Sequence, residues 1–258
     1  MKLRRSLPSL PFARSSILPL FLSVGLLLAA SPPASAHVVL DPEVVREILV
    51  GIDKEFKASQ EKVSSEARAE ALYRLGEKVQ GLVELLNQDF LAHGQSDLLA
   101  QFLVKRLETY GIKITFSEGE KRYAYDLAGF REYLNLAPNG RWAPDARFQL
   151  IARTFYETLG TDPAKLVKTD IPGLMKAVAE EEQFLKAYPQ HKRVKEVEFF
   201  LAVDYYRLLK NVKDPEKLEE YQRLSREALE RVADRYPGTL EAHAAKTLLE
   251  GLKNSAGN

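Results

Sequence analysis

The sequence predicts an all-α protein in which antiparallel helix pairs stack side by side as a helical repeat array. A pattern of helix end, proline corner and helix start recurs at Pro138, Pro189 and Pro237. Apolar residues also recur with the period of an α-helix along most of the chain beyond residue 40. The sequence contains no cysteine, so packing rather than a disulfide framework must hold this fold together.

The three proline corners are followed by matching residues. Small or aliphatic side chains stand five, eight and twelve positions after each proline, and these offsets fall on one face of a helix. They are Ala143, Ala146 and Leu150 in the first copy, Val194, Val197 and Leu201 in the second, and Ala242, Ala245 and Leu249 in the third. Each proline ends the preceding helix because it lacks an N–H donor and restricts the residue before it.

The first 36 residues have the pattern of a secretory signal peptide. The leader carries four basic residues and no acidic one: Lys2, Arg4, Arg5 and Arg14. An apolar run over 17–30 follows, shorter than the roughly 20 residues that a membrane-spanning helix needs. The next residues end in an Ala-x-Ala pattern. We therefore predict cleavage after Ala36 and export to the periplasm.

Loss of the leader changes the formal charge of the chain from +1 to −3. A nearly neutral exported protein is a poor candidate for nucleic-acid binding, which relies on clustered Lys and Arg. Because no cysteine is present to carry a lipid, we also expect no direct membrane anchor in the mature form. The sequence does not indicate an oligomeric state.

An N-terminal helical region is predicted over 37–111. Asp41-Pro42-Glu43 combines a capping side chain, a proline suited to the first helical position and an acid near the positive helix end. This start predicts a helix over 41–56. A polar, helix-favouring segment over 57–70 precedes a second apolar stripe over 71–90, which Gly94 closes. A further helix over 98–110 stops at Gly111.

The segment 112–126 is predicted to be a small β-hairpin or an irregular loop inserted between helices. Ile112 to Phe116 alternates apolar and polar residues, residues 117–120 are turn-like, and Tyr123 to Tyr125 resumes the alternation. A lone hairpin is marginal unless it packs on something. The repeat region follows over 127–253, with helix starts at Asp162-Pro163 and Asp214-Pro215, and a disordered tail over 254–258.

One predicted helix, beginning at Val194, is apolar around nearly its whole circumference. Its aromatic-rich part runs from Phe199 to Tyr206. A helix of this kind must be covered on more than one side. It is therefore either the central helix of the stack or a helix that also meets a partner.

The proline corners and the small residues after them resemble tetratricopeptide-like (TPR) repeats of bacterial envelope proteins. The resemblance is closest to BamD-like outer-membrane assembly lipoproteins and periplasmic Tol–Pal-associated repeat proteins, and covers about Leu127 to Lys253. The corners are 51 and 48 residues apart, more than the roughly 34 residues of a standard unit, so helices or loops must be longer here. The resemblance implies a TPR-like solenoid whose concave face binds a peptide or protein.

The sequence predicts no catalytic, cofactor-binding or metal-binding residue. Three histidines, His93, His191 and His243, form no metal-type spacing and are predicted to be polar surface residues. His37 would be the first mature residue, where its α-amine and imidazole could chelate copper(II), a hypothesis that a copper titration tests. The run Glu180 to Glu182 could hide a general acid, but its place on an amphipathic helix favours a solvated face.

The functional prediction is a non-enzymatic periplasmic scaffold that binds a protein or peptide partner. The partner would meet side chains in the groove or the aromatic-rich helix around Phe199 to Tyr206. The alternatives are a helical enzyme that acts on the cell wall through a Glu general acid, and copper binding at His37.

Overall fold

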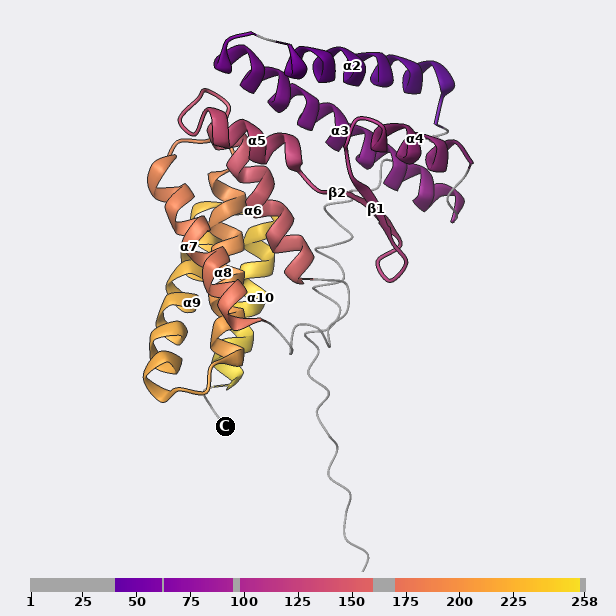
Figure 1. Ribbon diagram of the computed structural model, residues 1–258. Coiled ribbons are helices and arrows are strands. Elements are labelled where there is room, and N and C mark those ends of the chain that lie inside the picture. Colours follow the sequence, from indigo (N-terminus) through magenta and orange to yellow (C-terminus); the bar gives the residue numbers. More distant parts are fainter. Residues whose placement is uncertain (1–39, 62, 95–97, 160–169, 256–258) are drawn as a thin grey trace, which may run out of the picture.

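The computed structural model of the chain describes residues 40–61, 63–94, 98–159 and 170–255. In these ranges the chain forms helices and one two-stranded sheet (Figure 1). In chain order they are α2 (Pro42–Gln60), α3 (Ser65–His93), α4 (Leu98–Glu108), β1 (Ile114–Ser117), β2 (Arg122–Tyr125), α5 (Ala128–Leu136), α6 (Ala143–Leu159), α7 (Ile171–Ala187), α8 (Val194–Asn211), α9 (Pro215–Arg235) and α10 (Leu240–Ser255). The all-α prediction is confirmed. The proposed signal peptide, His37, the Asp162-Pro163 start and the end of the predicted tail lie outside the described residues.

The segment predicted as a hairpin or a loop is a hairpin. Strand β1 pairs with β2 in antiparallel register, with Thr115 opposite Ala124 and Phe116 opposite Tyr123. Asn87 of α3 fixes it in place: its side chain accepts from the Tyr123 N–H at 2.6 Å and donates to the Tyr123 carbonyl at 3.0 Å. Packing on α3 thus supplies the support that an isolated hairpin lacks.

The three proline corners have the same backbone geometry. The residue before each proline is the C-cap of its helix, with φ/ψ of −137°/66° at Ala137, −132°/54° at Tyr188 and −124°/50° at Tyr236. Each of these residues donates its N–H to the carbonyl of a buried residue four positions earlier, at 2.8, 2.8 and 3.2 Å. The small or aliphatic residues five and eight positions after each proline are all buried. The corners therefore join three antiparallel helix pairs, α5–α6, α7–α8 and α9–α10.

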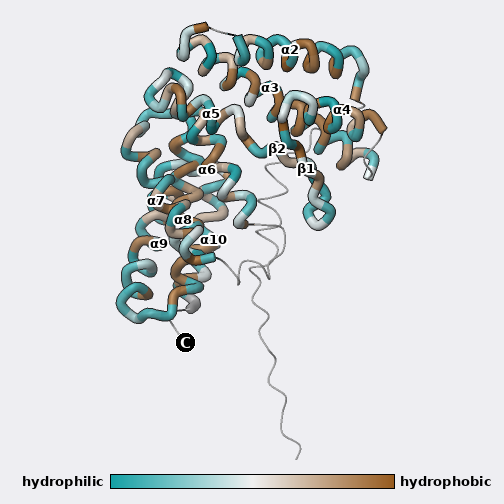
Figure 2. The backbone as a smooth tube through the Cα atoms, in the orientation of Figure 1, coloured by the Kyte–Doolittle hydropathy of each residue, from teal (hydrophilic) through white to brown (hydrophobic). Residues whose placement is uncertain are grey.

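The two N-terminal helices, α2 and α3, lie side by side at the top of Figure 1. Asp41 caps α2 as predicted, accepting from the Glu43 N–H at 2.8 Å. Helix α3 has 29 residues and begins at Ser65, inside the segment that the sequence predicted to be polar and helix-favouring. It ends at Gly94, whose φ of 71° suits the residue that closes a helix. Hydrophobic residues recur along both helices (Figure 2).

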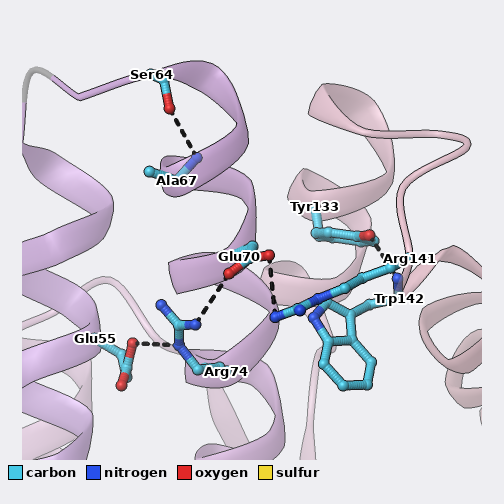
Figure 3. A network of polar contacts seen from close by, with 8 residues as sticks. All are labelled: Glu55, Ser64, Ala67, Glu70, Arg74, Tyr133, Arg141 and Trp142. Atoms are coloured by element: carbon cyan, nitrogen blue, oxygen red, sulfur yellow. Dashed lines mark hydrogen bonds and ion pairs between the residues drawn. The ribbon is translucent and has the colours of Figure 1, made fainter.

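Polar contacts join these N-terminal helices to the first proline corner (Figure 3). Arg74 of α3 donates to Glu55 of α2 at 3.0 Å and to Glu70 at 3.2 Å. Glu70 also pairs with Arg141, in the corner between α5 and α6, at 3.1 Å. Beside them the Tyr73 and Trp142 rings stack with centroids 5.0 Å apart and planes 4° apart. These direct contacts connect α3 to the first of the three helix pairs.

The buried apolar residues form two clusters. One runs from Leu40 to Ala146 and includes the hairpin, α5 and the start of α6. The other runs from Ile151 to Leu252 and fills the space among α6 to α10. The domain boundaries expected from the sequence stay a prediction.

Helix α8 lies in the centre of the second cluster. It packs against α6, α7, α9 and α10. Its aromatic residues Phe199, Phe200, Tyr205 and Tyr206 are all buried. The alternative in which this helix meets a partner directly is therefore wrong, because neighbouring helices cover its aromatic side chains.

Candidate functional site: the α6–α7 groove

A groove of about 590 Å³ lies between the hairpin, α5, α6 and α7, and we call it the α6–α7 groove. Two helix faces line it. One is formed by Leu150, Arg153, Thr154 and Glu157 of α6, and the other by Gly173, Lys176, Ala177 and Glu180 of α7. Each set occupies positions i, i+3, i+4 and i+7, which share one face of a helix.

The hairpin and the start of α5 form the remaining wall. Thr115 of β1 and its cross-strand partner Ala124 of β2 line the groove, together with Lys113, Asp126, Leu127 and Arg131. Phe116 and Tyr123, the next pair in register, line a different hollow. This follows from the alternation of side chains across a sheet.

The groove exists because the first helix of the first pair is short. Helix α5 has 9 residues, whereas the corresponding helices α7 and α9 have 17 and 21. Helix α6 has 17 residues, so α5 covers only part of it. The second half of α6 consequently forms the floor of a recess, with the hairpin on one side and α7 on the other.

Charged side chains of both signs surround the groove. Arg131 pairs with Asp126 at 3.5 Å, Arg153 donates to Glu157 at 2.6 Å, and Lys176 lies 3.8 Å from Glu180. Each pair has at least one solvent-exposed member and none is buried, so each contributes little to stability. A charged side chain of a bound polypeptide can therefore replace one member of such a pair at small energetic cost. Half-buried Leu150 supplies apolar surface between these pairs, whereas Leu127 and Ala177 also line the groove but are buried.

Comparison with known proteins identifies the family to which the chain belongs. The family model described as YfiO, outer membrane lipoprotein, matches residues 117–256, which include strand β2 of the hairpin and all three helix pairs. The chain belongs to the YfiO family. No curated protein and no solved structure matches the chain. The resemblance inferred from the proline corners is thereby confirmed.

Membership of the YfiO family associates the chain with the cell envelope. The family description is that of a lipoprotein, whereas this sequence contains no cysteine, so the absence of an anchor in the mature form stays a prediction. In the described ranges, no helix has the length and apolar character needed to cross a bilayer.

The structure separates the three glutamates that the sequence groups together. Glu180 lines the groove of this YfiO-family chain, and Glu182 accepts a hydrogen bond from the Tyr205 hydroxyl. Glu181 is buried among α7 and α8, which corrects the expectation of a solvated face for this residue. Burial, followed by the nearby Asp204 carboxylate, raises the pKa of Glu181 well above its usual range.

The described histidines stand apart from the groove. His93 contacts Asp89, with its Nδ1 3.0 Å from the Asp89 carbonyl, and His191 lies 3.5 Å from Asp145. His243 is exposed on α10. Among the described residues no group of three or more His, Cys, Asp and Glu is arranged to hold a metal ion.

Sequence reasoning missed the groove itself. Its lining residues run from Lys113 to Glu180 and come from five elements, none of which carries a recognisable motif. The only available signal was the i, i+3, i+4, i+7 spacing of mixed polar and small residues on α6 and α7, which many solvent-facing helices share.

Proposed function

We propose that this YfiO-family protein is a non-enzymatic scaffold of the cell envelope, exported to the periplasm, that binds a protein or peptide partner in the α6–α7 groove. The single observation that supports this most is the groove itself. It is an open recess between a face of α6 and a face of α7, in which the half-buried Leu150 lies among solvent-accessible ion pairs.

The shape suits a segment of polypeptide better than a small metabolite. Apolar side chains of a partner would contact the half-buried Leu150, and its charged groups would form new ion pairs with Arg153 or Lys176. A buried hydrophobic contact with polar groups at the rim is the common anatomy of protein interfaces.

The alternative of a cell-wall enzyme that uses a Glu general acid gains no support from Glu181. A general acid needs a raised pKa and access to substrate. Glu181 has the raised pKa, but its side chain is buried and does not line the groove. Copper binding at His37 stays a separate hypothesis, since that residue lies outside the described ranges.

Site-specific photo-crosslinking in the native envelope tests the proposal. A photoreactive amino acid replaces Thr154, on the floor of the groove, and in a second strain replaces Arg226, an exposed residue of α9. We expect a discrete cross-linked band from position 154 and none of the same mass from position 226. Equal labelling at both positions, or none at position 154, contradicts binding in the groove. The N-terminal residue of the purified mature protein, read by mass spectrometry, tests export and cleavage after Ala36.

A further inference from the structure

A buried polar site lies where α6, α7 and α8 pack against one another (Figure 1). Its members are Thr158 of α6, Glu181 of α7, and Asp204 and Arg207 of α8. Glu181, Asp204 and Arg207 are only 1%, 0% and 4% exposed. The charges of Asp204 and Arg207 both act on Glu181, so the three ionisable groups form one electrostatic unit. We call these four residues the buried polar site.

The guanidinium of Arg207 is already engaged by groups other than Glu181. It donates to the Asp204 carboxylate at 2.8 Å, and to the hydroxyl and the backbone carbonyl of Thr158 at 3.0 and 2.9 Å. In contrast, neither carboxyl oxygen of Glu181 has a hydrogen-bond partner among the described residues. Asp204 and Arg207 thus neutralise each other, and Glu181 is the carboxyl that is left over.

Glu181 interrupts the apolar packed face of α7. The other buried residues of this helix are Leu174, Ala177, Val178 and Phe184. Their spacing of three or four residues puts them on one side of α7 together with Glu181, and α8 packs against this helix. A carboxyl without a hydrogen-bond donor contributes nothing favourable at such a position, and burying it costs free energy. Packing alone therefore does not explain a glutamate here.

One proton decides the net charge of the buried polar site. With Glu181 protonated, the Asp204 carboxylate and the Arg207 guanidinium leave the site neutral. With Glu181 ionised, the site holds an uncompensated negative charge out of contact with water, which costs far more than a neutral carboxyl. Close packing of α7 on α8 consequently requires a proton on Glu181.

The charges nearest to Glu181 favour its proton. Burial, followed by the Asp204 carboxylate, raises the pKa of Glu181, and the flanking Glu180 and Glu182 carboxylates of α7 add to this effect. Arg207 is the cation that opposes them, and its guanidinium is already paired with Asp204.

The other groups around the site do not compensate an ionised Glu181. Tyr205 of α8 donates its hydroxyl to the neighbouring Glu182. Arg231 of α9 is exposed, and its charge acts on Tyr205. On α6, the charged residue next to the site is Glu157, which pairs with Arg153 in the groove.

The buried polar site is joined to both helix walls of the α6–α7 groove. Thr158, which Arg207 holds, directly follows Glu157 of the α6 wall. Glu181 directly follows Glu180 of the α7 wall. A movement of α7 away from α8 therefore moves Glu180 relative to Glu157 and changes the width of the groove.

We propose that Glu181 is a proton-dependent switch that sets the width of the α6–α7 groove. While Glu181 keeps its proton, α7 packs on α8 and the groove has the described width. When the proton leaves, the carboxylate is drawn toward water, α7 moves away from α8 and the groove widens. The movement is a property of the free protein. Its consequence rests on the proposed function: a partner that fits the narrow groove binds more weakly as the pH rises.

Electron paramagnetic resonance on the mature full chain tests the switch without any partner. Because the sequence contains no cysteine, a double Glu157→Cys, Lys176→Cys variant carries nitroxide labels on the two helix walls of the groove and nowhere else. We expect one short distance between the labels at about pH 5. A longer distance should appear as the pH rises toward about 9, and the ratio of long to short should grow by up to about tenfold per pH unit, because one proton is released.

Variants of the buried polar site should abolish this response. Glu181→Gln should keep the short distance at every pH, and Glu181→Leu should do the same if the glutamine variant is poorly folded. Asp204→Asn should also keep the short distance, because Arg207 is then free to pair with an ionised Glu181. The matched control is the label pair Arg226→Cys, Lys246→Cys at exposed positions of α9 and α10, whose distance should not change with pH.

A single label distance from about pH 5 to about pH 9 overturns the proposal, as does the same lengthening in the Glu181→Gln and Glu181→Leu variants. Loss of helical circular dichroism along with the lengthening would report unfolding and also overturns it. Lengthening that sodium chloride prevents and choline chloride does not would assign the neutralising charge to a bound cation instead of a proton. Partner affinity that is constant with pH while the labels separate would leave the switch intact and count against the groove as the partner's site.

Discussion

The guanidinium of Arg207, on α8, donates to the backbone carbonyl of Thr158, in the last turn of α6, at 2.9 Å. The same group donates to the Thr158 hydroxyl at 3.0 Å and to the Asp204 carboxylate at 2.8 Å. Arg207 and Asp204 are both buried. This contact ties the first helix pair to the second and satisfies a carbonyl that the end of α6 would leave unpaired.

We expect Arg207→Gln to destabilise the protein by about 3 kcal/mol or more, because it leaves the Asp204 charge buried without its partner. Urea denaturation measures the change. Arg223→Gln is the control, since Arg223 pairs with Glu227 at 3.0 Å on the exposed face of α9 and should cost less than about 0.5 kcal/mol. Similar losses in both variants contradict a special role for Arg207.

Glu181 should make the stability of the protein pH-dependent. Burial raises the pKa of Glu181, and also raises the pKa of Asp204, to about 6, against the opposing effect of Arg207. A raised pKa in the folded state gives stability that is complete below the unfolded value and is lost as the pH rises through the folded value. Glu181→Gln cannot ionise and removes this loss.

The difference in unfolding free energy between Glu181→Gln and the parent should shift in favour of the variant as the pH rises from about 4.5 to 8. The shift begins there because the carboxyl of the unfolded chain titrates near about 4.3. Urea denaturation at several pH values measures it. Glu220→Gln, at an exposed position of α9, serves as the control. A difference that is constant across this range contradicts the assignment of a raised pKa to Glu181.

A close approach of α3 and α5 depends on Gly129. A Cβ at this position would lie 2.8 Å from the Leu72 carbonyl oxygen and 3.1 Å from the Tyr125 hydroxyl. The Tyr125 hydroxyl accepts from the Gly129 N–H at 2.8 Å. We expect Gly129→Ala to cost about 1–3 kcal/mol by overpacking, measured by thermal or urea denaturation.

Gly81→Ala provides the opposite control for the same experiment. Gly81 lies in the middle of α3, and a Cβ there would meet nothing within 4 Å. The alanine should stabilise the protein by about 0.5–1 kcal/mol, because glycine is the poorer helix former. A Gly129→Ala variant that is as stable as Gly81→Ala would show that the two helices can separate freely.

The hairpin wall of the groove depends on Asn87. The Asn87→Ala variant loses both hydrogen bonds to the Tyr123 backbone, which should lower the free energy of unfolding by about 1–3 kcal/mol. Faster amide hydrogen exchange at Ala124 and Asp126 is the specific readout. Gln88→Ala, at the exposed neighbouring position, should leave that exchange unchanged. Equal exchange in the Asn87→Ala variant and the parent would show that other contacts hold the hairpin.

Much of the fold follows from local patterns in the sequence. Asp41 and Asp214 cap helices as their Asp-Pro signals indicate, and Gly94 and Gly111 have the positive φ expected after a helix. The proline corners keep one geometry because each relies on short-range contacts that the chain carries with it. The length of α3 was not predictable to the same degree, since its polar first turns show no apolar stripe.

The candidate site was not predictable in the same way. The groove arises from the difference in length between α5 and α7 and from where the hairpin packs, and both depend on contacts far apart in the chain. Glu181 shows the same limit. It lies between two other glutamates, and only the position of α8 decides that it is buried while they are not.

The central claim is that the α6–α7 groove binds the partner. Once cross-linking at position 154 has identified that partner, isothermal titration calorimetry can measure its affinity for the Thr154→Trp variant. This tests the claim directly, because the indole fills the floor of the groove. Arg226→Trp, on the exposed face of α9, is the matched control. We predict that Thr154→Trp weakens partner affinity at least about tenfold, a change of about 1.4 kcal/mol, while Arg226→Trp binds like the parent. Equal affinity of the two variants, both folded, would contradict the account.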